Sequence, residues 1–263
     1  MPSLLAMNHR FFIENLIQSD HVTIEGPEAH HLLHVVRIQM GQEVTLLDGS
    51  GYEFQARVVN CERRSAQLEI VSKVLVDREL SWELVVGVAL PKGERQRWLV
   101  EKATELGVTE LIPLTTERSV SEPTDRAVQR LQRTVVEASK QCGRTVMMRI
   151  RSAQTLSQYL ESVPLSNLRL IAHPSQSAGS NSHVSIPRPQ NDSQAVHLAF
   201  GPEGGFTDNE WQQACCLGWQ TVDLGPRILR IETSAIALIA ALVLNEKSTT
   251  VEPDQDPDGK SCH

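Results

Sequence analysis

Two glycine-marked loops in the last third of the sequence carry residue types that could hold a small ligand. The first loop is GPEGG, from Gly201 to Gly205, and the second is LGPRILRIET, from Leu224 to Thr233. Each loop follows a short apolar run and precedes a stretch with a helical pattern. Open α/β folds bind ligands outside the carboxyl ends of their parallel strands, so two such passages predict a binding site at one sheet edge.

The first loop offers mainly backbone groups to a ligand. Its glycines permit positive φ angles and a close approach of the backbone. No Lys-Ser or Lys-Thr pair follows Gly205, so the loop is not a Walker phosphate loop. Taken alone, the motif fits a ligand loop or an ordinary turn.

The second loop adds charged side chains. Arg227 and Arg230 flank an apolar pair, and Glu232 opens a strongly apolar helix that Thr233 or Ser234 could cap. Two arginines, a carboxylate and hydroxyl groups could together bind a nucleic-acid phosphate and handle a proton. The alternative is a capped helix beside an Arg–Glu surface pair.

The elements that position these loops alternate between strand and helix patterns, which predicts a parallel sheet. We expect strands at 83–90, 109–114, 147–150, 168–172, 196–200 and 221–224, and helices at 94–106, 125–142, 155–160 and 232–244. The last helix is apolar nearly all round, so it is either buried or shared with a second subunit.

The first 75 residues show a different pattern. Short apolar runs separated by turn signals, among them DGSG from Asp48 to Gly51, predict a small β-barrel. The segment EAHHLLHVVRI, which follows Gly26-Pro27, has apolar residues at helical spacing. Proline suits a first helical turn, so we expect a helix to begin there. We expect this short helix to be set into the barrel.

Three histidines and an arginine lie on that short helix. His30 and His34 are four residues apart, but no carboxylate or cysteine completes a metal-ligand set. The pattern favours a surface that contacts phosphate over a metal site, and Arg37 and Arg10 would belong to this surface. The alternative is packing combined with ordinary surface polarity.

The charge distribution is uneven. The net charge of −7 argues at first against a nucleic-acid partner, because phosphate contacts need Lys and Arg. However, the segment from Thr124 to Arg151 holds seven basic residues and two acidic ones, a local net charge of +5. A basic helix on an acidic protein is compatible with RNA binding, and a solvated helix face is the alternative.

Other protein classes fit the sequence poorly. The five cysteines lack metal spacing and look like reduced thiols of a cytoplasmic protein. The longest apolar run, 235–244, is too short to cross a bilayer, and the first residues do not form a signal peptide. We therefore expect no membrane partner and no metal. The Ser-, Pro- and Asn-rich segment 174–194 predicts a flexible loop.

Several motifs together resemble the bacterial small-subunit rRNA uridine N3-methyltransferases, a family of the SPOUT class. The motifs are RFF at 10–12, HHLLHVVR at 30–37, KGERQRWLVEKATELGV at 92–108, ERSV at 117–120, EASKQCGR at 137–144, GPEGGFTDNE at 201–210 and LGPRILRIETSA at 224–235. They follow one another in order from about residue 9 to 245. The departures are the loop after Pro174, the acidic tail, and Ile231, where Thr or Ala is often found.

This resemblance implies an α/β fold, with a SPOUT-type trefoil-knotted parallel-sheet domain preceded by a small PUA-like β-barrel domain. The expected boundaries are 1–76 for the RNA-binding domain, 77–246 for the methyltransferase domain and 247–263 for a disordered acidic tail. The resemblance also implies a homodimer with the knot near its interface. The implied cofactor is S-adenosylmethionine, and the implied partner is 16S rRNA or the 30S subunit.

The implied reaction is methylation of N3 of a specific uridine, U1498, in 16S rRNA. A SPOUT enzyme that acts on tRNA or on another rRNA base remains an alternative, as does a non-catalytic RNA-binding module. We expect the cofactor to be bound by Ala172, His173, Phe200, Gly201, Pro202, Gly204, Gly205, Leu224, Gly225, Ile228, Leu229 and Thr233. We expect RNA contacts from Arg10, His30, His31, Arg37, Lys92, Arg126, Arg133, Lys140 and Arg144.

Methylation at N3 requires removal of a proton, because neutral uridine has no free lone pair on that nitrogen. Glu203 and Glu232 are the candidate bases by position. We favour Arg230 as the group that stabilises the developing uridine anion, and an orienting role for Glu232. Because N3 lies on the pairing edge, the target base must be unpaired or flipped out.

Overall fold

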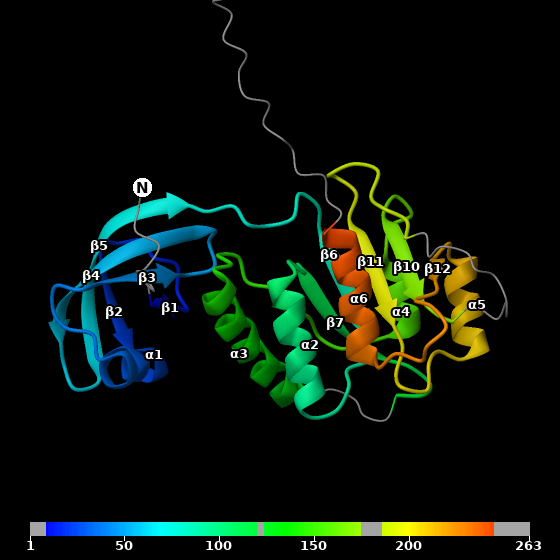
Figure 1. Cartoon of the computed structure of the whole chain (residues 1–263), viewed down its shortest axis with the longest axis horizontal. Helices are drawn as coiled ribbons and strands as arrows, with labels where there is room; N and C mark the ends of the chain where they lie inside the picture. Colours follow the sequence, from blue (N-terminus) through cyan, green and yellow to red (C-terminus); the bar gives the residue numbers. More distant parts are fainter. Residues whose placement is uncertain (1–8, 120–123, 175–185, 245–263) are drawn as a thin grey trace, which may run out of the picture.

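The structure, a computed structural model, describes residues 9–119, 124–174 and 186–244. A curled sheet built from the first part of the chain lies beside a larger α/β unit, and one extended connection joins them (Figure 1). The predicted tail 247–263 and most of the predicted loop 174–194 lie outside the described residues.

The curled sheet has the strand order β1-β3-β4-β5-β2, with β1 parallel to β3 and the other pairs antiparallel. Its strands are β1 (Arg10–Phe12), β2 (His21–Glu25), β3 (Glu43–Leu47), β4 (Tyr52–Cys61) and β5 (Ser65–Leu75). Alternate residues point inward, so Phe11, Leu46 and Leu68 share one buried core. This arrangement agrees with the short apolar runs of the sequence.

The predicted short helix is present, but its second half is wider than expected. It begins as α1 (Gly26–His30), with Pro27 in its first turn, and continues as the π-helical turn η1 (His31–Val36). Arg37 then ends it with a φ of 59°, in the left-handed region. Because a π-turn adds a residue per turn, the apolar spacing drifts and Val35 is 62% exposed.

The second sheet is parallel, with the order β12-β10-β11-β6-β7-β8 and β9 paired with the end of β7. Its strands are β6 (Leu84–Val88), β7 (Glu110–Thr115), β8 (Arg149–Ile150), β9 (Gln154–Thr155), β10 (Leu168–Ala172), β11 (Val196–Phe200) and β12 (Gln220–Val222). The central strand β6 is buried along its whole length, as its nearly continuous apolar run predicts.

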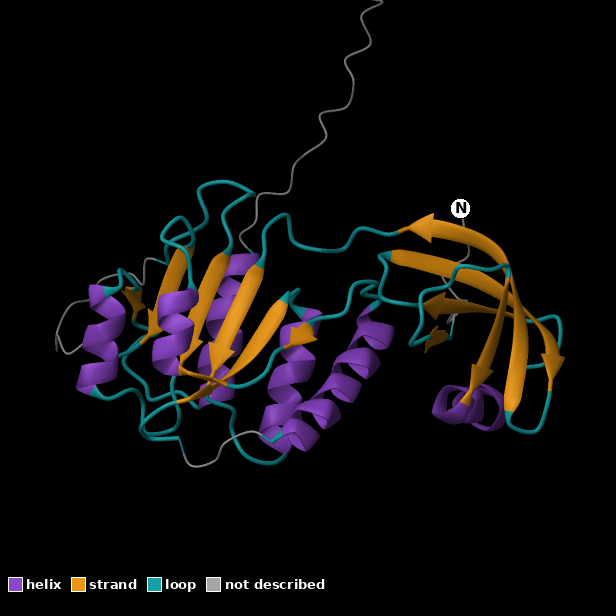
Figure 2. Ribbon diagram, turned by 180° about the vertical axis from the view of Figure 1, so that it is seen from behind, coloured by secondary structure: helices purple, strands orange, loops and turns teal. Residues whose placement is uncertain are grey.

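Helices cover both faces of this sheet (Figure 2). One face packs against α2 (Glu94–Glu105), α3 (Asp125–Cys142) and α6 (Ile231–Val243), and the other packs against α4 (Leu156–Ser162) and α5 (Asp208–Cys216). Among the described residues, no helix is long and apolar enough to cross a membrane.

The start of α6 differs from the prediction. The helix begins at Ile231, Arg230 is its N-cap residue, and no side chain caps it. The Ser234 hydroxyl instead donates to the Ile231 carbonyl oxygen over 2.8 Å. Ile231 is 4% exposed and packs into the main core, which explains why the helix starts one residue earlier than predicted.

Candidate functional site

The two predicted glycine-marked loops and the loop that starts at His173 begin at neighbouring strand ends. Phe200, the last residue of β11, pairs with Val88 of β6, and Ala172, the last residue of β10, pairs with Val222 of β12. The backbone N–H of His173 donates to the Val222 carbonyl oxygen over 3.1 Å. The chain therefore brings the loops after β10, β11 and β12 to one carboxyl edge of the sheet, as predicted from the sequence for the two glycine-marked loops.

The GPEGG loop is a tight turn in which glycine is needed. The Gly205 N–H donates to the Pro202 carbonyl oxygen over 2.8 Å, and Gly205 has a φ of 68°. A Cβ added to Gly201 would lie 3.1 Å from the backbone nitrogen of Phe206. The turn therefore folds back on itself, and a side chain at Gly201 would press against its backbone.

Residues after β7 hold this loop in place. They are not among the residues that the sequence predicts to bind the cofactor. Arg118 donates to the Gly204 carbonyl oxygen over 2.7 Å. The buried carboxylate of Glu210 accepts from the backbone N–H groups of Glu117 and Thr207, both at 2.8 Å. The Thr207-x-x-Glu210 spacing is a capping-box signal for α5, so the contact between Glu210 and Thr207 could be predicted from the sequence, whereas those of Glu117 and Arg118 could not.

The second loop is more open. The Gly225 N–H donates to the Asp223 carboxylate over 2.9 Å, and Gly225 has a φ of 98°. Arg227 is exposed, and the side chain of Ile228 is fully exposed. An apolar side chain in this position has surface left for a ligand or another chain.

The candidate catalytic carboxylates differ in their exposure. The side chain of Glu203 is 46% exposed, whereas that of Glu232 is 9% exposed. Arg95, in the first turn of α2, pairs with both carboxylates. Its guanidinium nitrogens lie 2.9 Å from a carboxylate oxygen of Glu203 and 3.8 Å from one of Glu232. Arg230 is exposed at the start of α6. Arg95 lies within the KGERQRW motif, but its spacing alone gave no reason to select it.

His173 has an unusual environment for a loop residue. Its ring stacks on Trp211 of α5, with centroids 5.2 Å apart and an angle of 15° between the planes. Burial lowers the pKa of His173 below its usual 6.5, although the charges of Asp208 and Asp223 oppose this shift. Its buried Nδ1 has no hydrogen-bond partner among the described residues. The Nδ1 of His173 is therefore available to a ligand.

The predicted RNA-binding residues fall into two groups. The first group is exposed and comprises His30, Arg37, Lys92, Arg126 and Arg133. His31 is half-buried against the ring of Phe11, with centroids 5.5 Å apart. The second group, Arg10, Lys140 and Arg144, lies where α3 meets the curled sheet and its connection.

The charges of the second group are paired within the chain, and the expected RNA contacts of Lys140 and Arg144 stay a prediction. Arg144 is 4% exposed, pairs with Glu79 over 2.6 Å, and donates to the Val108 carbonyl oxygen over 2.7 Å. Lys140 is 8% exposed and pairs with Glu28 over 2.9 Å. Arg10 is half-buried and donates to the Lys140 carbonyl oxygen over 3.4 Å. These cations join the two parts of the chain.

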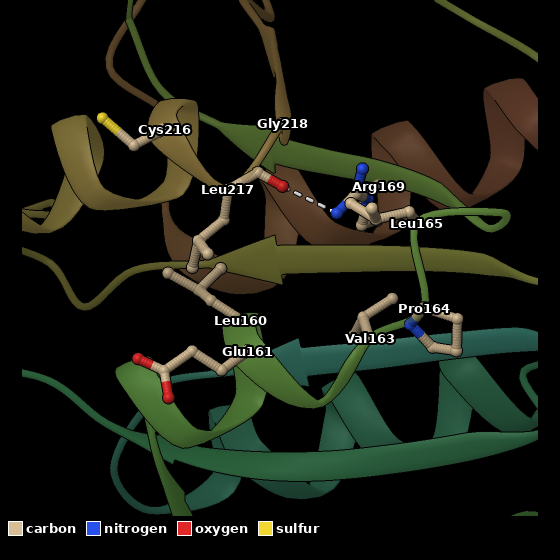
Figure 3. Close-up of a pocket in the computed structure, with 9 residues that line it drawn as sticks. All are labelled: Leu160, Glu161, Val163, Pro164, Leu165, Arg169, Cys216, Leu217 and Gly218. Carbon is tan, nitrogen blue, oxygen red and sulfur yellow. Dashed lines mark hydrogen bonds between the residues drawn. The ribbon is translucent and has the colours of Figure 1, made fainter.

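A hollow of about 480 Å³ lies at the opposite, amino edge of the sheet (Figure 3). Its lining includes Leu165, which is 80% exposed, and Arg169, near the start of β10. Arg169 donates to the Leu217 carbonyl oxygen over 2.6 Å and so satisfies the end of α5. The hollow is thus separate from the loops described above. Among the described residues, no group of three or more His, Cys, Asp or Glu could hold a metal ion.

Comparison with known families agrees with this geometry. The RNA methyltransferase domain family matches residues 78–243, and the RNA methyltransferase PUA domain family matches residues 24–71. The chain belongs to this RNA methyltransferase family. Its fold is therefore a PUA-like curled sheet followed by a parallel-sheet α/β methyltransferase domain, which confirms the predicted fold class, while the trefoil knot stays a prediction.

Two curated relatives carry the same name. Ribosomal RNA small subunit methyltransferase E of Synechocystis is 34% identical over 249 residues, which cover 92% of this chain and 80% of the relative. The protein of the same name from Bacillus subtilis is 28% identical over 252 residues, which cover 89% and 95%. The family membership expected from the motifs is confirmed.

Two solved structures are similar over most of the chain. Ribosomal RNA small subunit methyltransferase E from Neisseria gonorrhoeae, bound to S-adenosylmethionine, has a TM-score of 0.76 and 32% identity, and covers 88% of this chain and 95% of its own. A methyltransferase from Legionella pneumophila, also in complex with S-adenosylmethionine, has a TM-score of 0.76 and 28% identity, and covers 89% and 97%.

Proposed function

We propose that this RNA methyltransferase uses S-adenosylmethionine to methylate the ribosomal RNA of the small subunit. The observation that carries the proposal is the meeting of three loops, after β10, β11 and β12, at one carboxyl edge of the sheet. The similarity to two S-adenosylmethionine complexes along nearly the whole chain supports the cofactor. The shared name of the curated relatives supports the class of RNA.

The residues present at this edge fit the cofactor. A Cβ built on Gly205 would meet no atom within 4 Å, so a ligand can approach the loop backbone there, and the buried Nδ1 of His173 has no partner among the described residues. We assign cofactor contacts to the His173, GPEGG and LGPRILR loops, through Ala172, Phe200, Pro202, Gly204, Gly205, Leu224, Gly225, Ile228, Leu229 and Thr233. When bound, the cofactor supplies an electrophilic methyl group on a sulfonium.

The finer proposal is that the acceptor is N3 of U1498 in 16S rRNA. The chain must then hold the flipped base in line with the methyl group and assist loss of the N3 proton. Exposed Arg230 is free to approach O2 or O4 of the base and to stabilise the negative charge that develops there. Glu232 orients the reacting groups. Glu203, which is exposed, and Glu232 are the two candidate acceptors of the proton.

The RNA surface that we propose combines the exposed cations of both parts of the chain. Arg126 and Arg133 lie on α3, Lys92 precedes α2, and His30 and Arg37 belong to the helical segment of the curled sheet. Half-buried His31 flanks this surface. Phosphate contacts at these positions would attract RNA to an otherwise acidic protein.

We also propose that the protein works as a homodimer, in the cytoplasm, on free 16S rRNA or on the 30S subunit. Apolar surface is exposed on α6 and α2. Leu244, just after α6, is 78% exposed, Trp98 of α2 is 43% exposed, and Ala237 of α6 is also exposed. A second copy packed on this surface would explain why α6 is apolar nearly all round.

Two experiments test the function. Calorimetric titration of the purified protein with S-adenosylmethionine should show binding, and the absence of binding would favour a non-catalytic RNA-binding module. Mass spectrometry of nucleosides from a deletion strain should show loss of 3-methyluridine from 16S rRNA. Loss of a different modified nucleoside would instead identify an enzyme for another rRNA base or for tRNA.

A further inference from the structure

Arg95 connects two loops of the proposed cofactor site to a third element. It lies in the first turn of α2, the helix that follows β6 after a short loop. Its guanidinium lies between two carboxylates: Nη2 is 2.9 Å from Oε1 of Glu203, and Nη1 is 3.8 Å from Oε2 of Glu232. Glu203 belongs to the GPEGG loop and Glu232 to the first turn of α6. One side chain thus spans three strand-to-helix passages.

The two carboxylates place different demands on this arginine. Glu203 is 46% exposed, so water can solvate it. Glu232 is 9% exposed, and its Oε2 is buried without a hydrogen-bond partner among the described residues. A buried carboxylate oxygen without a donor is costly, and an opposite charge nearby reduces that cost. Arg95 supplies this charge, while Glu232 keeps an acceptor site open.

We propose that Arg95 is a positioning residue for methyl transfer, because it fixes the GPEGG loop relative to the buried carboxylate of Glu232. This inference rests on the proposed function, since it assigns a task to Arg95 within that site. The free Oε2 of Glu232 then accepts a hydrogen bond from an N–H group of the bound cofactor or of the uridine.

The planar guanidinium suits this task better than an ammonium group would. Its N–H groups form a rigid fork, so one cation can address two carboxylates in fixed directions. An isolated surface pair contributes little, but this cluster joins Arg95 to partners 108 and 137 positions later in the chain and includes a buried member. A loop held in this way is preorganised for its ligand.

The test compares Arg95→Gln and Arg95→Lys with Arg97→Gln, an exposed arginine on the same helix. Each protein is titrated with S-adenosylmethionine by calorimetry, assayed for single-turnover methylation of 30S subunits, and unfolded by heat. We expect R95Q to raise the cofactor Kd about tenfold and to lower the methylation rate. R95K should recover part of both losses because it keeps the charge, and R97Q should match the wild type.

A double-mutant cycle with Glu203→Gln tests the link to the loop. If Arg95 acts through Glu203, R95Q/E203Q should bind the cofactor no more weakly than R95Q alone, whereas independent roles would give additive losses. The proposal is overturned if R95Q binds and methylates as the wild type does. It is also overturned if R95K is as impaired as R95Q and both lose thermal stability in proportion.

The same experiments separate this inference from the proposed function. A wild-type protein that does not bind S-adenosylmethionine rejects the proposed function. A wild-type protein that binds the cofactor and methylates 30S subunits, together with an R95Q variant of equal activity, rejects only the role of Arg95.

Discussion

Gly87, in the central strand β6, is expected to tolerate no side chain. A Cβ built on Gly87 would lie 2.4 Å from Cε1 of Tyr159 and 2.9 Å from its Cδ1 and Cζ. The ring cannot move aside easily, because Tyr159 is 1% exposed and packs against Trp219 with centroids 5.5 Å apart. Its hydroxyl also donates to the Leu198 carbonyl oxygen over 3.0 Å.

Gly87→Ala should therefore destabilise the protein by two effects. Overpacking a buried site by one methyl group costs about 1–3 kcal/mol. A displaced ring would also lose the Tyr159 hydrogen bond, which contributes about 1 kcal/mol. The expected loss in the free energy of unfolding is thus about 2–4 kcal/mol.

Urea unfolding, followed by circular dichroism, measures this loss. Tyr159→Phe isolates the hydroxyl contribution, and Tyr159→Leu gives the added methyl group space. If the clash is the cause, Gly87→Ala should cost less in the Tyr159→Leu background than in the wild type. A loss below about 0.5 kcal/mol for Gly87→Ala alone, or equal losses in both backgrounds, would refute the steric argument.

Three further outcomes are expected. Arg230→Ala should lower turnover far more than it weakens cofactor binding by calorimetry; equal losses would contradict its role as anion stabiliser. Arg144→Ala should lower the free energy of unfolding in urea by about 3–5 kcal/mol, because it leaves Glu79 partly buried without its partner. Arg126→Ala should leave this free energy unchanged and weaken RNA binding in filter assays. Burial lowers the pKa of His197 to about 4 from 6.5, so the unfolded chain binds more protons than the folded chain between these pH values. The free energy of unfolding should therefore fall as the pH drops from 6.5 towards 4. In urea unfolding, His197→Gln should flatten this pH dependence.

The sequence predicts those elements whose limits depend on local patterns. The strands Leu168–Ala172 and Val196–Phe200 and the helix Asp125–Cys142 have the predicted bounds, because apolar runs, the cap at Thr124 and the glycine at 143 are visible in the chain itself. The helix after Arg230 starts earlier than predicted because Ile231 packs into a core made of distant residues. Local capping rules cannot detect that contact.

The candidate site divides in the same way. Glycine motifs identify the loops after β11 and β12, and the topology of a parallel sheet predicts that they meet. Arg95 and Arg118 could not be selected by spacing, because their partners lie 86 to 137 positions away. The wider π-turn that exposes Val35 was also unpredictable, since the apolar spacing of that segment fits an ordinary α-helix.

The basic residues of α3 and of the turn after it fall into a buried set and an exposed set, which composition cannot separate. Lys140, in its last turn, and Arg144, just beyond, have their charges buried against acids of the curled sheet and its connection. Arg126 and Arg133, nearer its start, face solvent. The helix therefore contacts the curled sheet at one end, and its other end carries the exposed cations that we propose for RNA binding. Because one rigid element does both, the curled sheet is fixed relative to the exposed cations, so RNA bound across both parts would reach the carboxyl edge in a defined orientation.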